Sequence, residues 1–248
     1  MYQFFVEPSQ IDENDNRVII TGSDVNHIKN VLRMKQGEEI TVSNGQDAKE
    51  YRCGILSFEE DRIICELRFI KEDGVELPSK VFLFQGLPKG DKMEFIIQKA
   101  VELGVYQVIP VAAKRCVVKL DEKKAKAKVS RWQGIVEAAA KQSKRSIIPK
   151  VADVMDFAQA LQFAADMDVK LIPYELAKGM EKTKAIFGRL KAGQSIAVFI
   201  GPEGGFEEKE IAMALEKGME PVTLGKRILR TETAGLAVLS WIMYFLES

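Results

Sequence analysis

Strand-like and helix-like segments alternate from residue 80 to the end of the chain, and this alternation is the strongest constraint on the fold. The expected strands are 80–85, 106–111, 169–174, 195–200 and 220–224. The expected helices are 91–103, 121–142, 153–165, 178–190, 207–217 and 231–246. Strands that alternate with helices form a parallel sheet with helices on both faces. The sequence therefore predicts an α/β fold for this part of the chain.

The first 70 residues follow a different pattern, in which short strands predominate. The expected strands include 39–43, 51–58 and 62–69. The first of them ends at Asn44-Gly45, which is a strong hairpin turn signal. One helix is expected to begin near Ser23 and to end before Gly37. This pattern predicts a small β-barrel with one helix. The polar segment 71–78 is typical of a linker, so we expect domains at residues 1–72 and 73–248.

The composition narrows the class of protein. Hydrophobic residues make up 46% of the 248 residues, which suffices for a globular core. No apolar run approaches the roughly 20 residues that span a bilayer, and the first residues lack the features of a signal peptide. Cys53, Cys65 and Cys116 form no CxxC pair, which fits a reducing cytoplasm and gives no zinc signature. We expect a cytoplasmic protein with no membrane segment and no metal.

The net charge is zero, but positive charge gathers in the middle of the chain. Residues 73–150 contain 16 Lys and Arg against 8 Asp and Glu. A basic surface of this kind favours contact with an RNA backbone, although basic runs also occur on faces that only solvent covers. The residues of this region with expected RNA contacts are Arg115, Lys119, Lys123, Lys124, Arg131 and Arg145.

Two glycine-rich segments near the C-terminus are the best candidates for a binding site. Residues 201–205 read Gly-Pro-Glu-Gly-Gly, and the second segment covers 224–235. Each follows an apolar run and leads into a helix, which places it at the carboxyl end of a strand, where open α/β sheets bind ligands. Glycine lets the backbone approach a flat ligand closely. Glu207 and Glu208 begin the helix after the first segment and disfavour a phosphate there. The alternative is a pair of purely structural turns.

These two segments resemble the cofactor loops of the SPOUT class of S-adenosylmethionine-dependent RNA methyltransferases. Four more segments, 27–34, 92–105, 115–120 and 141–145, are similar to the RsmE subfamily, which methylates N3 of a uridine in 16S ribosomal RNA. The resemblance covers nearly the whole chain. It implies a SPOUT-type parallel sheet with a C-terminal trefoil knot, preceded by a PUA-like β-barrel domain that binds RNA. It also implies the small ribosomal subunit as partner and a homodimer to which the apolar helix 231–246 contributes.

The resemblance, together with three strand-end loops, indicates how S-adenosylmethionine binds. The expected cofactor-binding residues are Pro173, Tyr174, Gly201, Pro202, Glu203, Gly204, Gly205, Leu224, Gly225, Ile228, Leu229, Thr233 and Ala234. In the first domain, the resemblance implies RNA contacts for Arg33 and His27, whereas a structural role is the alternative for His27.

Methylation of uridine N3 requires loss of the imide proton, and the resulting negative charge spreads onto the ring carbonyl oxygens. A fixed cation near those oxygens lowers the barrier, and a carboxylate can accept the proton. Arg230 and Glu232 are the expected catalytic residues, with Glu203 as a second carboxylate. A structural ion pair between Arg230 and Glu232 is the alternative. Two other functions stay open: methylation of another RNA target, and non-catalytic RNA binding in ribosome assembly.

Overall fold

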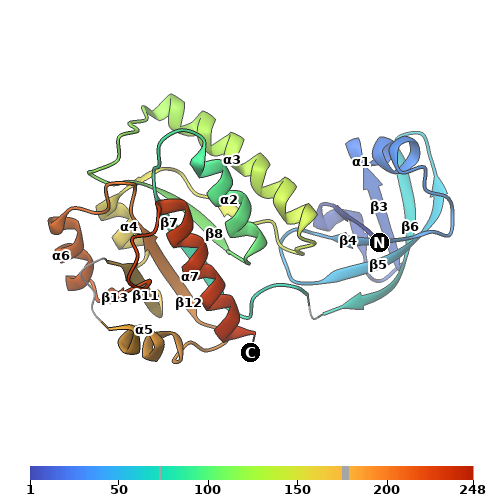
Figure 1. Cartoon of the computed structure of the whole chain (residues 1–248). Helices are drawn as coiled ribbons and strands as arrows, with labels where there is room; N and C mark the ends of the chain where they lie inside the picture. Colours follow the sequence, from blue (N-terminus) through green and yellow to red (C-terminus); the bar gives the residue numbers. More distant parts are fainter. Residues whose placement is uncertain (73, 175–178, 248) are drawn as a thin grey trace. The chain divides into compact units, whose positions relative to one another are not determined.

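The computed structural model describes residues 1–72, 74–174 and 179–247 (Figure 1). The chain forms two compact units. The first consists of Met1–Glu76 together with Ala140–Ile148, and the second of Leu77–Ala139 together with Pro149–Ser248. The expected boundary between residues 72 and 73 therefore lies a few residues earlier than the division at Glu76, and Asp73 itself lies outside the described residues.

The first unit is built on one curled sheet, which corresponds to the expected small barrel. Its strands are β1 (Tyr2–Phe5), β2 (Ile11–Asp12), β3 (Arg17–Thr21), β4 (Glu39–Ser43), β5 (Glu50–Phe58) and β6 (Arg62–Lys71). Their order in the sheet is β1-β4-β5-β6-β3-β2, with β1 parallel to β4 and the other pairs antiparallel. Alternate positions of β3 and β6 point inward, so that Val18, Ile20, Ile63 and Cys65 are fully buried.

The structure confirms two local expectations for this unit. β4 and β5 pair antiparallel as a hairpin, and residues 44–49 connect them. The Asn44 side chain accepts hydrogen bonds from the N–H groups of Gln46 and Asp47, at 2.9 and 3.1 Å, and so stabilises this loop. The helix comprises α1 (Ser23–Asn26) and the π-helical turn η2 (His27–Val31). It ends before Gly37 because Arg33 adopts the left-handed conformation, with φ of 53°.

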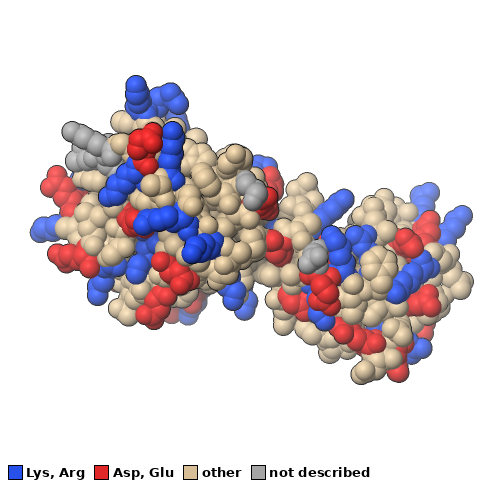
Figure 2. Space-filling view, turned by 90° about the horizontal axis from the view of Figure 1, so that it is seen from below, with Lys and Arg blue, Asp and Glu red and all other residues tan. Residues whose placement is uncertain are grey.

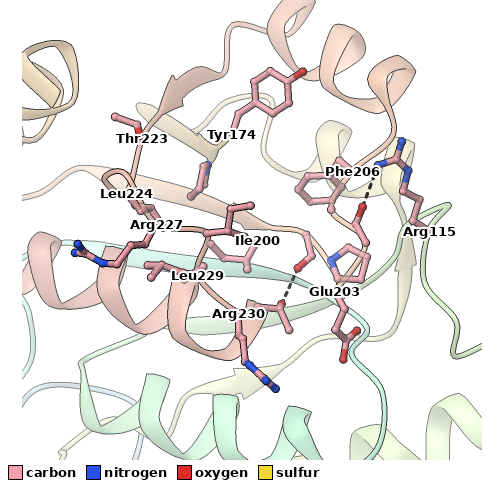
Figure 3. Close-up of a pocket in the computed structure, with 18 of the residues that line it drawn as sticks. Arg115, Tyr174, Ile200, Glu203, Phe206, Thr223, Leu224, Arg227, Leu229 and Arg230 are labelled. Atoms are coloured by element: carbon pink, nitrogen blue, oxygen red, sulfur yellow. Dashed lines mark hydrogen bonds between the residues drawn. The ribbon is translucent and has the colours of Figure 1, made fainter. Parts of the chain in front are cut away.

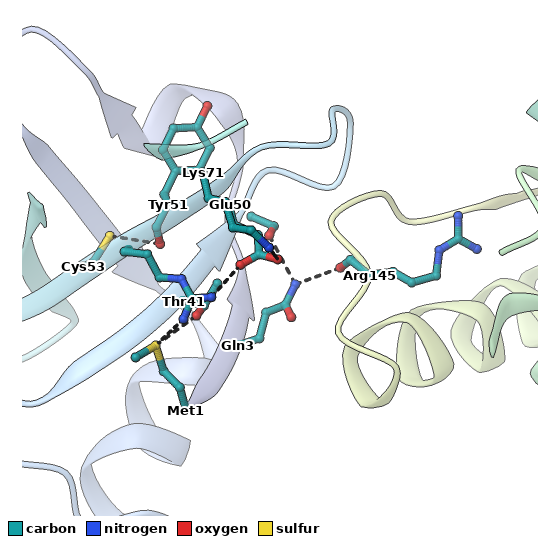
Figure 4. A network of polar contacts seen from close by, with 10 residues as sticks. Met1, Gln3, Thr41, Glu50, Tyr51, Cys53, Lys71 and Arg145 are labelled. Carbon is teal, nitrogen blue, oxygen red and sulfur yellow. Dashed lines mark hydrogen bonds and ion pairs between the residues drawn. The ribbon is translucent and has the colours of Figure 1, made fainter. Parts of the chain in front are cut away.

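Segment 140–148 joins the first unit through a buried ion pair. The Arg145 guanidinium is 4% exposed, and its Nε lies 3.1 Å from Oε2 of Glu76. Oε1 of Glu76 also accepts the backbone N–H groups of Ser146 and Ile147, both at 3.0 Å. The Gln3 side chain donates to the Arg145 carbonyl at 2.8 Å (Figure 4). Arg145 therefore holds the segment in place, which corrects its expected role in RNA contact: a buried, paired guanidinium does not reach a phosphate.

The second unit contains the expected parallel sheet. Its strands are β7 (Lys80–Gly86), β8 (Gln107–Ala112), β9 (Lys150–Val151), β10 (Met155–Asp156), β11 (Val169–Pro173), β12 (Ser195–Ile200) and β13 (Glu220–Val222). The order is β10-β8-β7-β12-β11-β13, and β9 also pairs with β8. The strands that follow β7 in the sequence, β8 to β10, lie on one side of it in the sheet. The later strands β11 to β13 lie on its other side. The order thus reverses at β7 and β12, and ligands bind at such a switch point, beyond the carboxyl ends of the strands.

Among the described residues, six helices follow β7. They are α2 (Lys92–Glu102), α3 (Glu122–Gln142), α4 (Phe157–Phe163), α5 (Met180–Phe187), α6 (Glu208–Glu216) and α7 (Thr231–Leu246). Residue 178, where the fourth helix was expected to begin, lies outside the described residues. α7 packs against β12, α2 and α5 (Figure 1). Its buried positions include Gly235, Val238, Leu239 and Ile242, a spacing that places them on one face. Tyr244, near its end, is 66% exposed.

Candidate functional site

A cavity of about 630 Å³ lies where the loops after β11, β12 and β13 meet (Figure 3). Pro173 and Tyr174 line it from the first loop, residues 201–206 from the second and residues 223–230 from the third. All of the expected cofactor-binding residues except Thr233 contribute to the lining. Thr233 is exposed on the first turn of α7, where its N–H donates to the Arg230 carbonyl at 2.9 Å.

Much of the cavity wall is bare backbone, because the loop after β12 closes on itself. A Cβ atom at Gly201 would lie 3.0 Å from Cα of Gly205, which is closer than ordinary side chains allow. Gly205 has φ of 67°, and its N–H donates to the Pro202 carbonyl at 2.8 Å. At the end of β7, a Cβ at Gly86 would lie 2.6 Å from the Pro202 nitrogen. The main chain is therefore available to a ligand where side chains are excluded.

The hydroxyl group of Thr231, at the start of α7, connects that helix to β7 and to the loop after β12. Thr231 Oγ1 donates to the Gly201 carbonyl at 2.6 Å and accepts from Nε2 of Gln85 at 2.9 Å. Gln85 is fully buried at the end of β7 and also donates to the Gly86 carbonyl at 2.9 Å. The first residue of α7 thus fixes the glycine loop after β12 relative to β7.

Glu203 is held by donors at the rim of the cavity. Lys92 Nζ lies 2.8 Å from its Oε1, and the Lys89 backbone N–H donates to the same oxygen at 3.1 Å. Burial acts to raise the pKa of Glu203, but the hydrogen bonds from Lys92 and from the Glu203 and Lys89 backbone outweigh it and lower the pKa. Glu203 is therefore a carboxylate at neutral pH and a weaker base than an ordinary glutamate.

Arg230 and Glu232, the expected catalytic residues, do not pair with each other among the described residues. The Arg230 side chain lines the cavity, is exposed and has no hydrogen-bond or ion-pair partner in the described part of the chain. Glu232 lies beside the cavity lining, with its Oε2 atom 3.7 Å from Lys92 Nζ. That oxygen is buried and accepts no hydrogen bond within the described ranges. The site thus offers a guanidinium and a carboxylate that are both incompletely satisfied.

The expected RNA-binding residues fall into three groups. Arg115 lines the cavity and donates to the Gly204 carbonyl at 3.0 Å, so it contacts the glycine loop directly. Lys119, which precedes α3, and Lys123, in its first turn, are exposed. Lys124 and Arg131, further along α3, form surface ion pairs with Asp121 at 3.2 Å and Glu94 at 2.8 Å. Figure 2 shows that Lys and Arg are interspersed with Asp and Glu on one face of the molecule.

The other two expected RNA contacts, His27 and Arg33, lie in the first unit. The His27 ring packs edge-on against Phe4, with 6.4 Å between the ring centroids, whereas the Arg33 side chain is exposed. His27 is half-buried and packs against the core of this unit, and part of its side chain stays open to solvent.

Sequence reasoning missed part of the cavity wall. The residues concerned are Lys92, Ile200, Phe206, Ile211, Thr223, Lys226, Arg227 and Thr231. Four of these residues adjoin or lie within the glycine-rich segments, and their position in the sequence could have predicted that they line the cavity: Ile200, Phe206, Lys226 and Arg227. Lys92 is separated from Glu203 by 111 residues, and no local pattern links the two.

The described residues contain no group of three or more His, Cys, Asp or Glu placed to hold a metal ion. No helix in this part of the chain has the length and apolar character needed to cross a membrane.

Family models and relatives agree on the class of this chain. A model described as an RNA methyltransferase domain matches residues 75–243, and one described as an RNA methyltransferase PUA domain matches residues 20–68. A protein from Bacillus subtilis named ribosomal RNA small subunit methyltransferase E is 43% identical, over 100% of this chain and 98% of its own length.

Solved structures give the same result. A crystal structure described as a hypothetical protein has a TM-score of 0.90 and 43% identity, covering 99% of this chain and 98% of its own. The structure of a ribosomal RNA small subunit methyltransferase E from Neisseria gonorrhoeae, bound to S-adenosyl methionine, has a TM-score of 0.78 and 34% identity. It covers 97% of this chain and 96% of its own. The latter relative binds its cofactor within the same fold.

The contact between Lys92 and Glu203 predicts a measurable change in titration. Since the lowered pKa of Glu203 depends largely on the Lys92 side chain, Lys92→Met should raise it toward the ordinary value. Any stability that this contact contributes is present above the ordinary glutamate pKa and is lost as pH falls through the lowered one. NMR titration of carboxyl-labelled protein measures the pKa. Lys89→Met is the control, because only the backbone of Lys89 contacts Glu203. An unchanged Glu203 titration in Lys92→Met would show that the ion pair does not control this carboxylate.

Proposed function

This chain belongs to the RNA methyltransferase family, and on that premise we propose that it methylates N3 of a uridine in 16S ribosomal RNA with S-adenosylmethionine as methyl donor. The observation that carries the proposal is the backbone-walled cavity at the ends of β11, β12 and β13, in a fold shared over nearly its whole length with relatives named ribosomal RNA small subunit methyltransferase E.

The cavity has the properties that S-adenosylmethionine requires. Its volume of about 630 Å³ lies within the roughly 300–1,000 Å³ typical of small-molecule sites. Residues 201–205 and 224–229 line the cavity and offer main-chain N–H and C=O groups, and the close approach of Gly201 to Gly205 leaves little room for a side chain at position 201. Bound S-adenosylmethionine supplies a methyl group on a positively charged sulfur. The protein residues then have to bind the uridine and remove its N3 proton.

Within this proposal, Arg230 stabilises the uracil anion and Glu232 accepts the N3 proton. Glu203 is the weaker candidate for proton acceptor, since Lys92 and Lys89 engage it and its pKa is lowered. Glu232 keeps an oxygen without a hydrogen-bond donor in the described chain, and Lys92 lies close enough to hold the carboxylate in place. The unpaired Arg230 guanidinium is free to donate to the ring carbonyl oxygens, where charge develops.

We propose that RNA contacts come from both parts of the chain. The expected division into a PUA-like RNA-binding domain at 1–72 and a methyltransferase domain at 73–248 is supported by the two family models. Arg115, Lys119, Lys123, Lys124 and Arg131 are exposed and suit the RNA backbone, as do His27 and Arg33 in the first domain. Phosphate contacts of this type give affinity with little sequence specificity.

The family resemblance supports three further proposals. We propose that the C-terminal segment forms a trefoil knot, consistent with β13 pairing with β11 and not with its predecessor β12. We propose a homodimer to which the end of α7 contributes, since Tyr244 and Phe245 are 66% and 39% exposed. We also propose a cytoplasmic location, where small ribosomal subunits are available.

The product of the reaction tests the proposed function. Small ribosomal subunits from cells that lack this gene are incubated with the protein and S-adenosylmethionine labelled in its methyl group. Nucleosides from the 16S RNA are then separated. We expect the label in N3-methyluridine, at about one methyl group per subunit. Label in another nucleoside, or in transfer RNA only, indicates a different target, and S-adenosylmethionine binding without transfer indicates a non-catalytic assembly factor.

Two substitutions test the catalytic roles. Arg230→Ala should keep cofactor affinity within a few-fold but lower single-turnover methylation by roughly 10²-fold or more, as when one preorganised donor is lost. Raising the pH should partly restore this variant, because more of the uracil is then ionised without help. Glu232→Gln should lower the rate by roughly 10²-fold or more and should also regain rate at high pH. Single-turnover pH–rate profiles measure both effects.

Glu203→Gln is the matched carboxylate variant, and its single-turnover rate should fall less than that of Glu232→Gln. The reverse order would assign the proton to Glu203. A wild-type rate in Arg230→Ala, or a loss of cofactor binding only, would make Arg230 structural.

A further inference from the structure

A second cavity, of about 210 Å³, lies within the first unit. Its lining includes Tyr2, Phe4, His27, Lys141, Gln142 and Lys144. Two of the sequence segments singled out above, 27–34 and 141–145, therefore converge on one hollow together with β1, although more than 100 residues separate them. The proposed transfer of a methyl group at the glycine loops uses none of these six side chains.

Aromatic rings form one side of this cavity. Phe4 is 1% exposed and provides a fixed apolar surface, and the His27 ring packs edge-on against it. Tyr2 is 52% exposed, so its ring has a face open to solvent. Exposed rings beside a hollow are suited to stacking with a flat heterocycle, and such stacking depends little on which base is bound.

Cations lie beside the rings. Lys141 Nζ stands 5.1 Å from the centroid of the Phe4 ring and 2.9 Å from Oδ1 of Asp24, so its position is fixed and its charge is balanced. Lys144 is exposed and forms no ion pair among the described residues, which leaves its charge available. Gln142, one residue beyond Lys141, adds an exposed amide.

The backbone that carries Lys144 is held rigidly. Lys144 itself has φ of 60°, a left-handed conformation that is unusual for a lysine. The next residue, Arg145, is held by its ion pair with Glu76. Its carbonyl also accepts a hydrogen bond from the Gln3 side chain (Figure 4). Strained backbone that its surroundings hold in place is common at binding sites. The backbone position from which the Lys144 side chain extends beside the cavity is therefore fixed.

We propose that this cavity binds one unpaired nucleotide of the RNA substrate, with the base against Tyr2 and His27 and the phosphate at Lys144. The inference rests on the proposed function, since it takes the substrate to be RNA. The volume is below the roughly 300–1,000 Å³ of sites for drug-sized ligands, so it accommodates a single ring system. Proteins read RNA mainly at unpaired nucleotides, whose bases are free to stack on aromatic side chains.

Binding of the full-length protein to a fluorescein-labelled decauridylate at low salt tests the proposal. Tyr2→Ala and Lys144→Glu should each weaken binding by about tenfold or more, the scale for losing one stacked base or one phosphate contact. Phe69→Ala and Lys35→Glu are matched controls, since both residues are exposed in the same unit and away from the cavity. Both controls should bind the decauridylate within about two- to threefold of wild type. Affinity for S-adenosylmethionine, measured by calorimetry, should be unchanged in Tyr2→Ala.

Equal affinities for wild type, Tyr2→Ala and Lys144→Glu would overturn the proposal, as would an equal loss in Lys35→Glu, which would indicate general charge attraction only. A wild-type protein that binds no decauridylate would overturn it as well. Photocrosslinking with a 4-thiouridine oligonucleotide gives a second readout, with crosslinks expected in residues 1–4 or 141–144. Methylation of small subunits by the wild-type protein tests the proposed function separately. Activity there combined with unaffected Tyr2→Ala and Lys144→Glu variants therefore overturns the cavity proposal alone.

Discussion

The hydroxyl group of Thr231 is the interaction on which the arrangement of the cofactor cavity depends. It donates to the Gly201 carbonyl and accepts from the buried Gln85 amide, so it joins β7, the loop after β12 and the start of α7. Without it the fully buried Gln85 amide loses an acceptor and the Gly201 carbonyl loses its donor, and a buried polar group left unsatisfied costs about 1–3 kcal/mol. This hydrogen bond acts together with the packing of Phe206 against Phe157 in holding the loop.

Lys92 lies between two carboxylates near this loop, and it contacts them at different distances. Lys92 neutralises Glu203 at hydrogen-bond distance but approaches Glu232 only to 3.7 Å. Lys92 and the Lys89 backbone thus satisfy the Glu203 carboxylate, whereas Oε2 of Glu232 accepts no hydrogen bond within the described residues. The two glutamates therefore have different surroundings, and this difference is the basis on which we propose different roles for them.

The sequence was most informative where structure is local. The β-α alternation predicted β7, β8, β11, β12 and β13 of the described sheet to within about two residues at each end, and the glycine segments predicted most of the cavity wall. It failed where distant residues meet. Gln85 and Thr231, which share a hydrogen bond, are 146 residues apart in the sequence. Segment 140–148, which the Arg145–Glu76 ion pair holds, belongs to the first unit although it lies in the expected second domain. The Asn44-Gly45 signal correctly predicted the hairpin between β4 and β5, whose loop the Asn44 side chain stabilises.

The affinity for S-adenosylmethionine of two Thr231 variants, measured by calorimetry, tests the central role of this hydroxyl most directly. Thr231→Ser keeps the hydroxyl and should bind within a few-fold of wild type. Thr231→Val keeps the shape but removes the donor to Gly201, and its dissociation constant should rise by about tenfold or more. Wild-type affinity in a folded Thr231→Val protein would contradict the account, since the glycine loop would then hold its binding conformation without the hydrogen bond.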